Sequence, residues 1–292
     1  MLIYDTIVHR IPIEKGWSGD RKFQAVTSDG RTYLLRISST DKLDRKRREF
    51  TQMSKVARLE IPMCRPVEFG VCEEGVYSIQ AWINGVDAET AMMTLDKQAQ
   101  YRYGIDAGRI LAKIHTLPAP QDVPKWEARF NAKIDRKLAM YNACTLKYPG
   151  GEAFIRFIEE NRHKLNDRPQ SYQHGDYHIG NMMIDENAVL TIIDFDRDDF
   201  GDPWEEFNRI VWCAQAAPAF ASGMVDGYFD GPPPQDFWDL LALYIATNTL
   251  SSLPWAIPFG EGEIQVMQNQ AAQVLTWYNS MTQTIPTWYH KN

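Results

Sequence analysis

The pattern of hydrophobic and polar residues divides the chain into a β-rich start and a longer helical remainder. Residues 9–38 alternate apolar and polar side chains, which predicts two or three strands. The Ser28–Gly30 stretch between them suits a tight hairpin turn, because Asp and Gly tolerate positive φ. Residues 39–60 carry apolar side chains at helical spacing, and residues 65–83 predict two further strands.

After residue 84 the apolar positions recur mainly with the period of a helix. The stretches that predict helices are 94–120, 126–141, 151–165, 202–217, 234–253 and 261–281. Two short strands, near 182–184 and 189–193, interrupt this series. The pattern predicts an α+β protein, with a small β lobe holding one helix over residues 1–83 and a larger, mainly helical lobe over residues 84–292.

Composition is that of an ordinary globular protein: 44% of the 292 residues are apolar and 24% are charged. No run reaches the roughly 18 apolar residues of a membrane span. The N-terminus has neither the basic start nor the long apolar run of a signal peptide, so a cytoplasmic protein is expected. The four cysteines form no C-x-x-C pair and are expected to be reduced.

The net charge of −7 argues against nucleic acid as a partner, because binding phosphates needs a basic surface. The one basic run, Asp44–Phe50, falls within a predicted helix and is interpreted as a solvated helix face. We therefore expect a small-molecule partner rather than nucleic acid or a membrane. The oligomeric state is left open.

Three polar acceptors stand out in the apolar stretch Gln173–Asp196. Asp176 and Asn181 lie five residues apart on one loop, and Asp194 ends the second of the two short strands. A hairpin would bring Asn181 and Asp194 side by side, as oxygen ligands of the kind that Mg²⁺ prefers. Asp176 could then accept a proton from an attacking hydroxyl. This combination is what phosphoryl transfer requires.

The same residues carry a resemblance. "HGDYHIGN" followed by "IIDFDRDDFGDP" resembles the paired motifs of the aminoglycoside phosphotransferase family, which is related to choline and homoserine kinases. The resemblance implies a protein-kinase-like two-lobed fold and a nucleoside triphosphate, ATP or GTP, as co-substrate with Mg²⁺. It makes Asp176 the catalytic aspartate and Asn181 and Asp194 the metal ligands. His174 and Asp202 match residues that support the loop.

In the small lobe, the resemblance implies positions that bind the nucleotide. Arg36 stands on the third strand where kinases usually carry a lysine, and Glu49 is its expected partner on the helix. The residues expected at the phosphate-covering hairpin are Gly16, Ser18 and Gly19, and those of the connector that meets the base are Gln80, Ala81, Trp82 and Ile83.

Other interpretations remain open at this point. Asp176 is also typical of a turn, Glu49 of a solvated helix face, and Arg36 of an edge strand whose charge reaches water. His174 and His178 flank Asp176, which raises a metal hydrolase, but no further histidine lies in a metal-binding pattern. A nucleotide-binding protein without turnover is the alternative that Arg36 suggests.

The identity of the acceptor substrate is what the sequence determines least. An acidic cluster beyond the metal site would suit a cationic, aminoglycoside-like acceptor by charge complementarity. Its members are Asp198, Asp199, Glu205 and Glu206. The last two also fit the ordinary preference for acids in the first turn of a helix. An amino alcohol, a sugar or a macrolide is the alternative acceptor.

Overall fold

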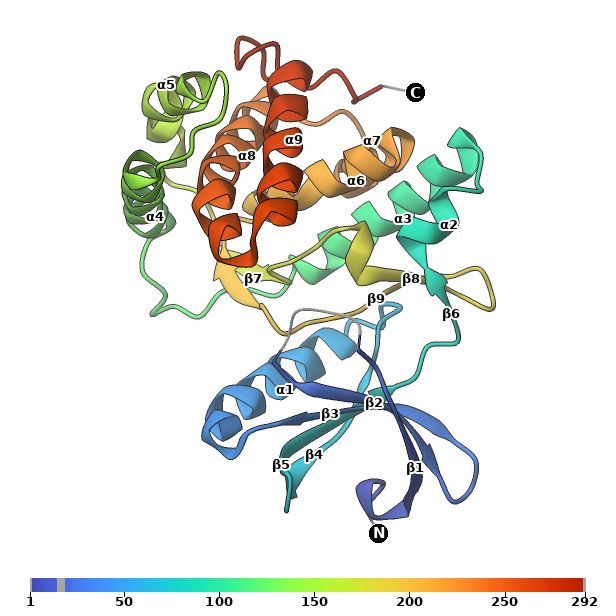
Figure 1. Ribbon diagram of the computed structural model, residues 1–292. Helices are drawn as coiled ribbons and strands as arrows, with labels where there is room; N and C mark the ends of the chain where they lie inside the picture. The colour runs from blue at the N-terminus through green and yellow to red at the C-terminus, as the bar shows by residue number, and fades with distance from the viewer. Residues whose placement is uncertain (1, 15–18, 291–292) are drawn as a thin grey trace. The chain divides into compact units, whose positions relative to one another are not determined.

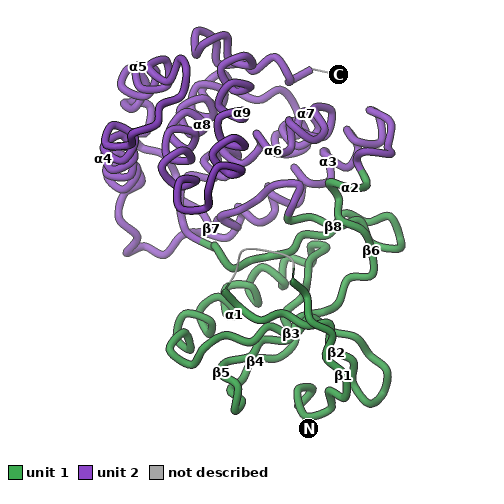
Figure 2. The backbone as a smooth tube through the Cα atoms, viewed as in Figure 1, with its two compact units in different colours: residues 1–91, 181–198 green, residues 92–180, 199–292 purple. Residues whose placement is uncertain are grey.

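The computed structural model describes residues 2–14 and 19–290, and its chain divides into two compact units (Figure 2). The first comprises residues 1–91 and 181–198, and the second residues 92–180 and 199–292. The secondary structure confirms the predicted α+β class, with an antiparallel sheet in the first unit and mainly helices in the second.

The first unit is built on a five-stranded antiparallel sheet in the order β1-β2-β3-β5-β4 (Figure 1). Its elements are β1 (Ile7–Pro12), β2 (Arg21–Thr27), β3 (Thr32–Ser38), α1 (Leu43–Ala57), β4 (Pro66–Cys72) and β5 (Gly75–Ala81), with the short turns η1 (Tyr4–Thr6) and η2 (Thr40–Lys42). The strands predicted over residues 9–38 and 65–83 and the helix within residues 39–60 are therefore confirmed.

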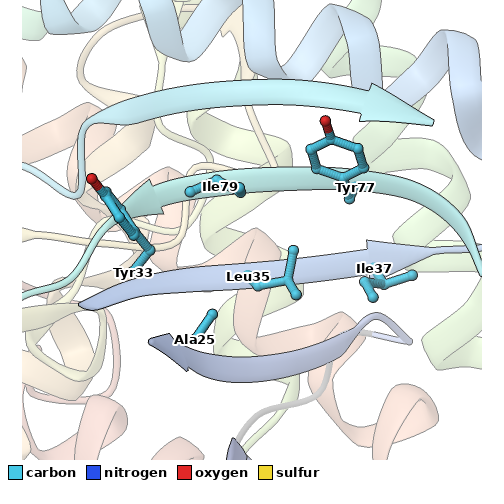
Figure 3. Close-up of a cluster of buried hydrophobic side chains, with 6 residues drawn as sticks. All are labelled: Ala25, Tyr33, Leu35, Ile37, Tyr77 and Ile79. Atoms are coloured by element: carbon cyan, nitrogen blue, oxygen red, sulfur yellow. The ribbon is translucent and has the colours of Figure 1, made fainter. Parts of the chain in front are cut away.

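One face of this sheet holds an apolar core (Figure 3). Its members come from three neighbouring strands: Ala25, Tyr33, Leu35, Ile37, Tyr77 and Ile79. Because side chains alternate along a strand, Arg36 must point to the opposite face from Leu35 and Ile37. There it lines a small cavity together with Lys46 and Phe50 of α1. The same alternation that builds the core therefore places the charge of Arg36 on the side of the sheet that faces α1.

A second, three-stranded sheet explains why residues 181–198 belong to the first unit. It joins β6 (Gly85–Asp87), β8 (Met182–Asp185) and β9 (Leu190–Ile192) in the order β6-β8-β9. Gly85 pairs with Asp185, and Met182 pairs with Ile192. The predicted strands near 182–184 and 189–193 are confirmed, whereas β6 was not expected. The compact units therefore divide the chain differently from the boundary expected between residues 83 and 84.

The second unit consists mainly of helices around one small two-stranded sheet (Figure 1). The helix α2 (Ala88–Met92) leads into it. The larger helices are α3 (Lys97–Ile114), α4 (Trp126–Ala143), α5 (Glu152–Asn161), α6 (Ile210–Ala216), α7 (Pro218–Phe229), α8 (Gln235–Ala256) and α9 (Glu261–Trp277). The shorter elements are η3 (Arg162–Leu165), β7 (Ser171–Gln173), η4 (Ile179–Asn181), β10 (Asp199–Gly201), η5 (Glu205–Arg209) and η6 (Ile257–Phe259).

Glycines allow α3 and α7 to approach each other closely. A Cβ added at Gly104 of α3 would lie 2.1 Å from the carbonyl oxygen of Phe220, and one added at Gly227 of α7 would lie 2.2 Å from that of Ile105. Only hydrogen atoms fit at these positions, so neither glycine can be replaced without separating the helices. This contact fixes α3, to which Tyr177 of the loop after β7 is hydrogen-bonded.

The helix α8 forms the centre of the second unit. Most of its side chains are buried, and its N-terminal half holds the aromatic residues Phe237, Trp238 and Tyr244. By length and mean composition alone, the window Gln235–Phe259 could cross a membrane, although polar residues interrupt its apolar run. Because 67% of its most apolar stretch is buried within the protein, the window matches the core helix of a soluble protein.

Candidate active site

The loop after β7 holds Asp176, and a buried carboxylate fixes its backbone. The N–H groups of His174 and Gly175 donate to Glu206 at 2.6 and 2.9 Å. The N–H of Asp176 in turn lies 3.3 Å from Nδ1 of His174, which is fully buried. Gly175 has a φ of +83°, which a residue with a Cβ rarely adopts. The loop is thus held in a single conformation by contacts distant in sequence.

Two further contacts tie this loop to the helices. The hydroxyl of Tyr177 donates to the carbonyl oxygen of Ala107 on α3 at 2.7 Å. The N–H of Ile179 lies 3.3 Å from Sγ of Cys213 on α6. Burial raises the pKa of Tyr177 well above its ordinary value, so the phenol keeps the proton that it donates. Asp176 therefore sits between anchored neighbours.

The carboxylate of Asp176 contacts a cation that the sequence did not point to. Its Oδ1 lies 3.3 Å from Nε of Arg209, at the end of η5, and 3.7 Å from Nε2 of His178. The side chains of Asp176 and Arg209 are 16% and 27% exposed, so both can reach a ligand. No motif in the sequence marks Arg209, because it lies 33 residues further along an ordinary helical pattern.

In the first unit, the two expected metal ligands are brought together. The N–H of Ile193 donates to the carbonyl oxygen of Asn181 at 3.0 Å, so Asn181 and Asp194 flank the open end of the β8–β9 hairpin. Asp194 has a φ of +65°, an uncommon conformation for a residue with a Cβ. Such strain is typical of functional positions. The predicted juxtaposition is confirmed, whereas the role of the two residues as ligands stays a prediction.

Arg36 meets three carboxylates. Its Nη1 lies 2.8 Å from Oδ1 of Asp194, and its Nη2 lies 2.8 Å from Oδ2 of Asp196 and 3.3 Å from Oδ2 of Asp20. The guanidinium is 7% exposed. Burial alone would lower the pKa of Arg36, but the charges of the three aspartates outweigh it and raise that pKa. Asp20 and Asp196 are partners that the sequence analysis missed, although the D-x-D spacing of 194 and 196 was visible.

The expected ion pair between Arg36 and Glu49 is not formed among the described residues. Glu49 instead lies 2.7 Å from Nε of Arg45 and 2.8 Å from Nζ of Lys46. These cations precede Glu49 by four and three residues on α1, so they share its helix face and occupy its carboxylate. Lys46 also lies 2.8 Å from Asp20. Glu49 is therefore linked to Arg36 indirectly, through Lys46 and Asp20 and through Arg45 and Asp196.

The oxygen donors at the hairpin end fit Mg²⁺. The described residues contain no cluster of three or more histidines, cysteines, aspartates or glutamates arranged around one point, as a full protein cage would need. Mg²⁺ needs no such cage, since it binds through one or two carboxylates and takes its other ligands from water and phosphates. Burial, followed by the charge of Asp194, raises the pKa of Asp196. The cluster contains four carboxylates, Asp20, Glu49, Asp194 and Asp196, and three cations, Arg36, Arg45 and Lys46.

The structure describes only some of the other residues expected to bind the nucleotide. Gly16 and Ser18 lie outside the described residues, and Gly19 is exposed. Gln80 is buried at the end of β5, and the N–H of Ala81 donates to the carbonyl oxygen of Arg65 at 2.8 Å.

The connector between β5 and β6 leaves three residues, Trp82, Ile83 and Asn84, outside any strand. Within the described chain, Trp82 and Ile83 make no backbone hydrogen bond. A cavity of about 430 Å³ adjoins them, lined on its other sides by Ile61, Pro62 and the turn between β8 and β9. This cavity contains none of the residues expected to bind phosphate or metal.

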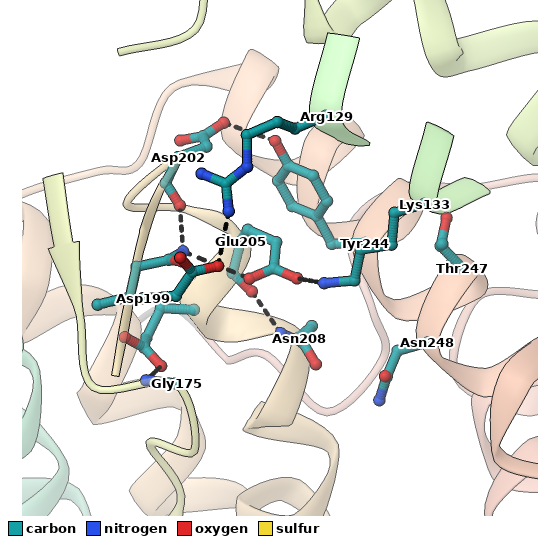
Figure 4. Close-up of polar contacts among 12 residues, drawn as sticks. Arg129, Lys133, Gly175, Asp199, Asp202, Glu205, Asn208, Tyr244, Thr247 and Asn248 are labelled. Atoms are coloured by element: carbon teal, nitrogen blue, oxygen red, sulfur yellow. Dashed lines mark hydrogen bonds and ion pairs between the residues drawn. The ribbon is translucent and has the colours of Figure 1, made fainter. Parts of the chain in front are cut away.

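Three of the four acidic residues expected to attract a cationic acceptor are already engaged, and Figure 4 shows two of them, Asp199 and Glu205. Asp199 lies 2.8 Å from Nη2 of Arg129, and Glu205 lies 2.9 Å from Nζ of Lys133. The side chain of Glu206 is 1% exposed and accepts the loop N–H groups. Asp198 is half-buried. The expected role of these four residues stays a prediction, but internal cations or N–H donors already compensate three of them.

Asp202 occupies a buried position consistent with a support. Its carboxylate accepts from Nε and Nη2 of Arg168 at 2.6 and 2.9 Å, and from the hydroxyl of Tyr244 at 2.6 Å. The N–H of Trp204 lies 3.0 Å from the same group. Asp202 is fully buried, so it holds the start of η5 and cannot meet a ligand directly.

Fold and loop together define a phosphotransferase of protein-kinase-like architecture. The chain matches the sequence family described as "Phosphotransferase enzyme family" (APH) over residues 9–240. It therefore belongs to this family, and it is a small-molecule kinase by class. No curated protein matches the sequence.

Solved structures share the fold at low sequence identity. A thermostable mutant of aminoglycoside phosphotransferase APH(4)-Ia is similar with a TM-score of 0.65 and 18% identity, over 94% of this chain and 96% of the other. A choline/ethanolamine kinase family protein from Mesorhizobium loti has a TM-score of 0.64 and 16% identity, over 91% and 87%. Macrolide 2'-phosphotransferase MphH from Brachybacterium faecium has a TM-score of 0.62 and 16% identity, over 89% and 91%. At these identities the likeness concerns the fold.

Proposed function

We propose that the enzyme transfers the γ-phosphoryl group of ATP or GTP, with Mg²⁺, to a hydroxyl group of a small molecule in the cytoplasm. The observation that carries the proposal is the anchored loop. Glu206 and His174 hold the backbone at Asp176, and Asn181 follows only five residues later, at the start of the hairpin that ends in Asp194. Phosphoryl transfer depends mainly on such positioning.

Each residue then has a defined task. Asp176 accepts the proton of the acceptor hydroxyl while its oxygen forms a bond to the γ-phosphorus and the bond to the leaving nucleoside diphosphate breaks. Asn181 and Asp194 would hold Mg²⁺, which neutralises phosphate charge when bound. Arg36 places a charge at the same point and can bind phosphate oxygens with its fork of N–H donors. Trp82 and Ile83 offer free backbone groups to the base.

Relatives of known structure support the co-substrate. APH(4)-Ia has been solved with ADP and hygromycin B, and with AMP-PNP and hygromycin B. A nucleoside triphosphate and a hydroxyl compound are the corresponding pair for this enzyme. At this level of sequence identity, hygromycin B itself is not proposed as the acceptor of this enzyme.

A nucleotide-binding protein without turnover is the second candidate. The observation that favours it is the contact of Arg36 with both Asp194 and Asp196, since a cation already occupies their carboxylates. The anchored catalytic loop argues for turnover, because a protein that only binds nucleotide has no need of a fixed Asp176.

The test is nucleoside diphosphate release from Mg·ATP and Mg·GTP in the presence of a panel of hydroxyl compounds, together with nucleotide binding by calorimetry. We expect binding and acceptor-dependent release that Asp176→Asn abolishes. Binding without release from any compound, and without slow hydrolysis by water, would favour the second candidate.

A further inference from the structure

The second unit holds a group of cations, Lys133, Lys137 and Arg209, of which Arg209 contacts Asp176. Lys133 and Lys137 stand one helical turn apart on α4, so they share a face. Figure 4 shows Lys133 reaching Glu205, at 2.9 Å, with Asn248 of α8 nearby. Nζ of Lys137 lies 3.3 Å from Oδ1 of that Asn248.

Lys137 lacks the partner that a buried ammonium needs. It forms no ion pair with any described residue, and its hydrogen bond goes to a neutral amide. The charged groups that act on it are the cations Lys133, Arg136 and Arg209 and the single anion Glu205. Burial, followed by these cations, lowers the pKa of Lys137 to about 7. A half-buried lysine without a counter-ion is costly to keep.

One of these cations, Arg209, also contacts the loop that holds Asp176. Arg209 acts electrostatically on Lys137 and also pairs with Asp176, at 3.3 Å. Glu205 and Asp176 are the two carboxylates that pair with Lys133 and Arg209, so Lys137, when protonated, adds a positive charge that neither of these ion pairs compensates. The side chains of Lys133 and Arg209 are 35% and 27% exposed, so the group is open to a ligand.

We propose that Lys133, Lys137 and Arg209 bind an anionic group, a carboxylate or a phosphate, carried by the acceptor whose hydroxyl reacts at Asp176. This inference rests on the proposed function. An anionic acceptor is favoured over a cationic one because Asp199, Glu205 and Glu206 already have cations or N–H donors as partners, whereas Lys137 has no counter-ion among the described residues. An anion there receives charge-assisted hydrogen bonds and removes the cost of the unpaired ammonium.

The substrates that test this share one three-carbon scaffold and differ in charge. They are glycerate and glycerol phosphate, which are anionic, glycerol, which is neutral, and serinol, which is cationic. Nucleoside diphosphate release with Mg·ATP gives kcat/KM for each. We expect the anionic compounds to exceed glycerol and serinol at least tenfold, and the ratio of glycerate to glycerol phosphate distinguishes the two anionic groups.

Variants of Lys137 test whether this residue causes the expected preference for anionic compounds. Lys137→Met keeps the alkyl chain and should lower kcat/KM for the preferred anion by about ten- to a hundredfold, through KM, with glycerol unchanged. Lys137→Glu should shift the preference toward serinol. Lys125→Met, at the exposed start of the same helix, is the matched control and should behave as wild type.

Several outcomes overturn the inference while the proposed function stands. These are a preference for serinol or glycerol, or an unchanged preference for anions in Lys137→Met. If none of the compounds is phosphorylated, calorimetric titration with glycerate and glycerol phosphate decides, and the absence of binding by both refutes the anion site. Failure of the proposed function is separate and is measured with Mg·ATP: the nucleotide is then not bound, or it is bound and neither transferred to a hydroxyl compound nor slowly hydrolysed by water.

Discussion

Arg36 on β3 holds Asp194, with its Nη1 2.8 Å from Oδ1 of the carboxylate. The same guanidinium also reaches Asp196 at 2.8 Å, so one buried cation joins the sheet to the segment that follows the β8–β9 hairpin. Both residues belong to the first unit. The expected metal ligand is thus positioned by a cation rather than left free.

Arg36→Ala should therefore weaken folding and change the response to Mg²⁺. Removing one member of a buried ion pair leaves the others uncompensated, at a cost of about 3–5 kcal/mol in the free energy of unfolding. Because Asp194 and Asp196 then lack a counter-ion, added Mg²⁺ should raise the melting temperature of the variant more than that of the wild type. Thermal unfolding with and without MgCl₂ measures both effects.

The control for Arg36 lies at the exposed first residue of β2. Arg21→Ala removes a guanidinium whose side chain is 54% exposed and should cost little. If Arg36→Ala unfolds at the same temperature as Arg21→Ala, and Mg²⁺ affects both equally, the ion pairs of Arg36 do not stabilise this unit.

Glu206→Gln should disturb the catalytic loop. The buried carboxylate accepts the N–H groups of His174 and Gly175, and an amide can accept fewer bonds of lower strength. We expect a loss of about 1–3 kcal/mol in the free energy of unfolding and a lower kcat, with nucleotide affinity retained. Glu159→Gln, on an exposed face of α5, is the matched control. An unchanged kcat in Glu206→Gln would show that the loop keeps its shape without this carboxylate.

Asp194→Ala should remove the dependence of nucleotide binding on Mg²⁺. The carboxylate is the strongest candidate ligand at the hairpin end, and Asn181 alone offers only a neutral oxygen. Calorimetric titration with ATP, in MgCl₂ and in EDTA, should give two similar affinities for the variant and different ones for the wild type. If the variant still gains affinity with MgCl₂, Asp194 is not the metal ligand.

Lys137 should make the stability of the protein depend on pH. Because its pKa falls from 10.5 to about 7 in the folded state, the unfolded chain binds more protons between these values, and stability should rise with pH across that window. The charged groups that face Lys137 are Lys133, Arg136, Arg209 and Glu205, and the charge of Lys133 holds the pKa of Glu205 below its usual value despite burial.

Urea unfolding at pH 6.5 and pH 9 measures this dependence (~25 °C, two-state analysis). Lys137→Met should flatten it and should stabilise the protein most at the lower pH, where the wild-type ammonium is charged. An equal slope in both proteins would mean that Lys137 is solvated like an ordinary lysine.

The order of strands and helices could be predicted because each depends on local pattern. So could the meeting of Asn181 and Asp194, because a short hairpin leaves its two ends no other arrangement. The partners of Arg36 could not be predicted from the sequence, because Asp20 and Asp196 lie 16 and 160 residues away from it along the chain.

Glu49 and Glu206 are two further residues whose partners could not be predicted from the sequence. Arg45 and Lys46 neutralise Glu49 locally, which competes with the ion pair expected from the resemblance. Glu206 has the sequence context of a helix start, yet it accepts hydrogen bonds from a loop more than 30 residues earlier. Both outcomes depend on side-chain direction and burial, which the linear pattern does not specify.

The central claim is that Asp176 accepts the proton of an acceptor hydroxyl during phosphoryl transfer. The most direct measurement is the single-turnover rate of γ-phosphoryl transfer from Mg·ATP by wild type and Asp176→Asn, with nucleotide affinity measured on the same samples. The asparagine keeps the shape of the loop and cannot take the proton, so we predict transfer reduced by about a hundredfold or more, with affinity within about twofold. Transfer at a rate close to that of the wild type would contradict the account.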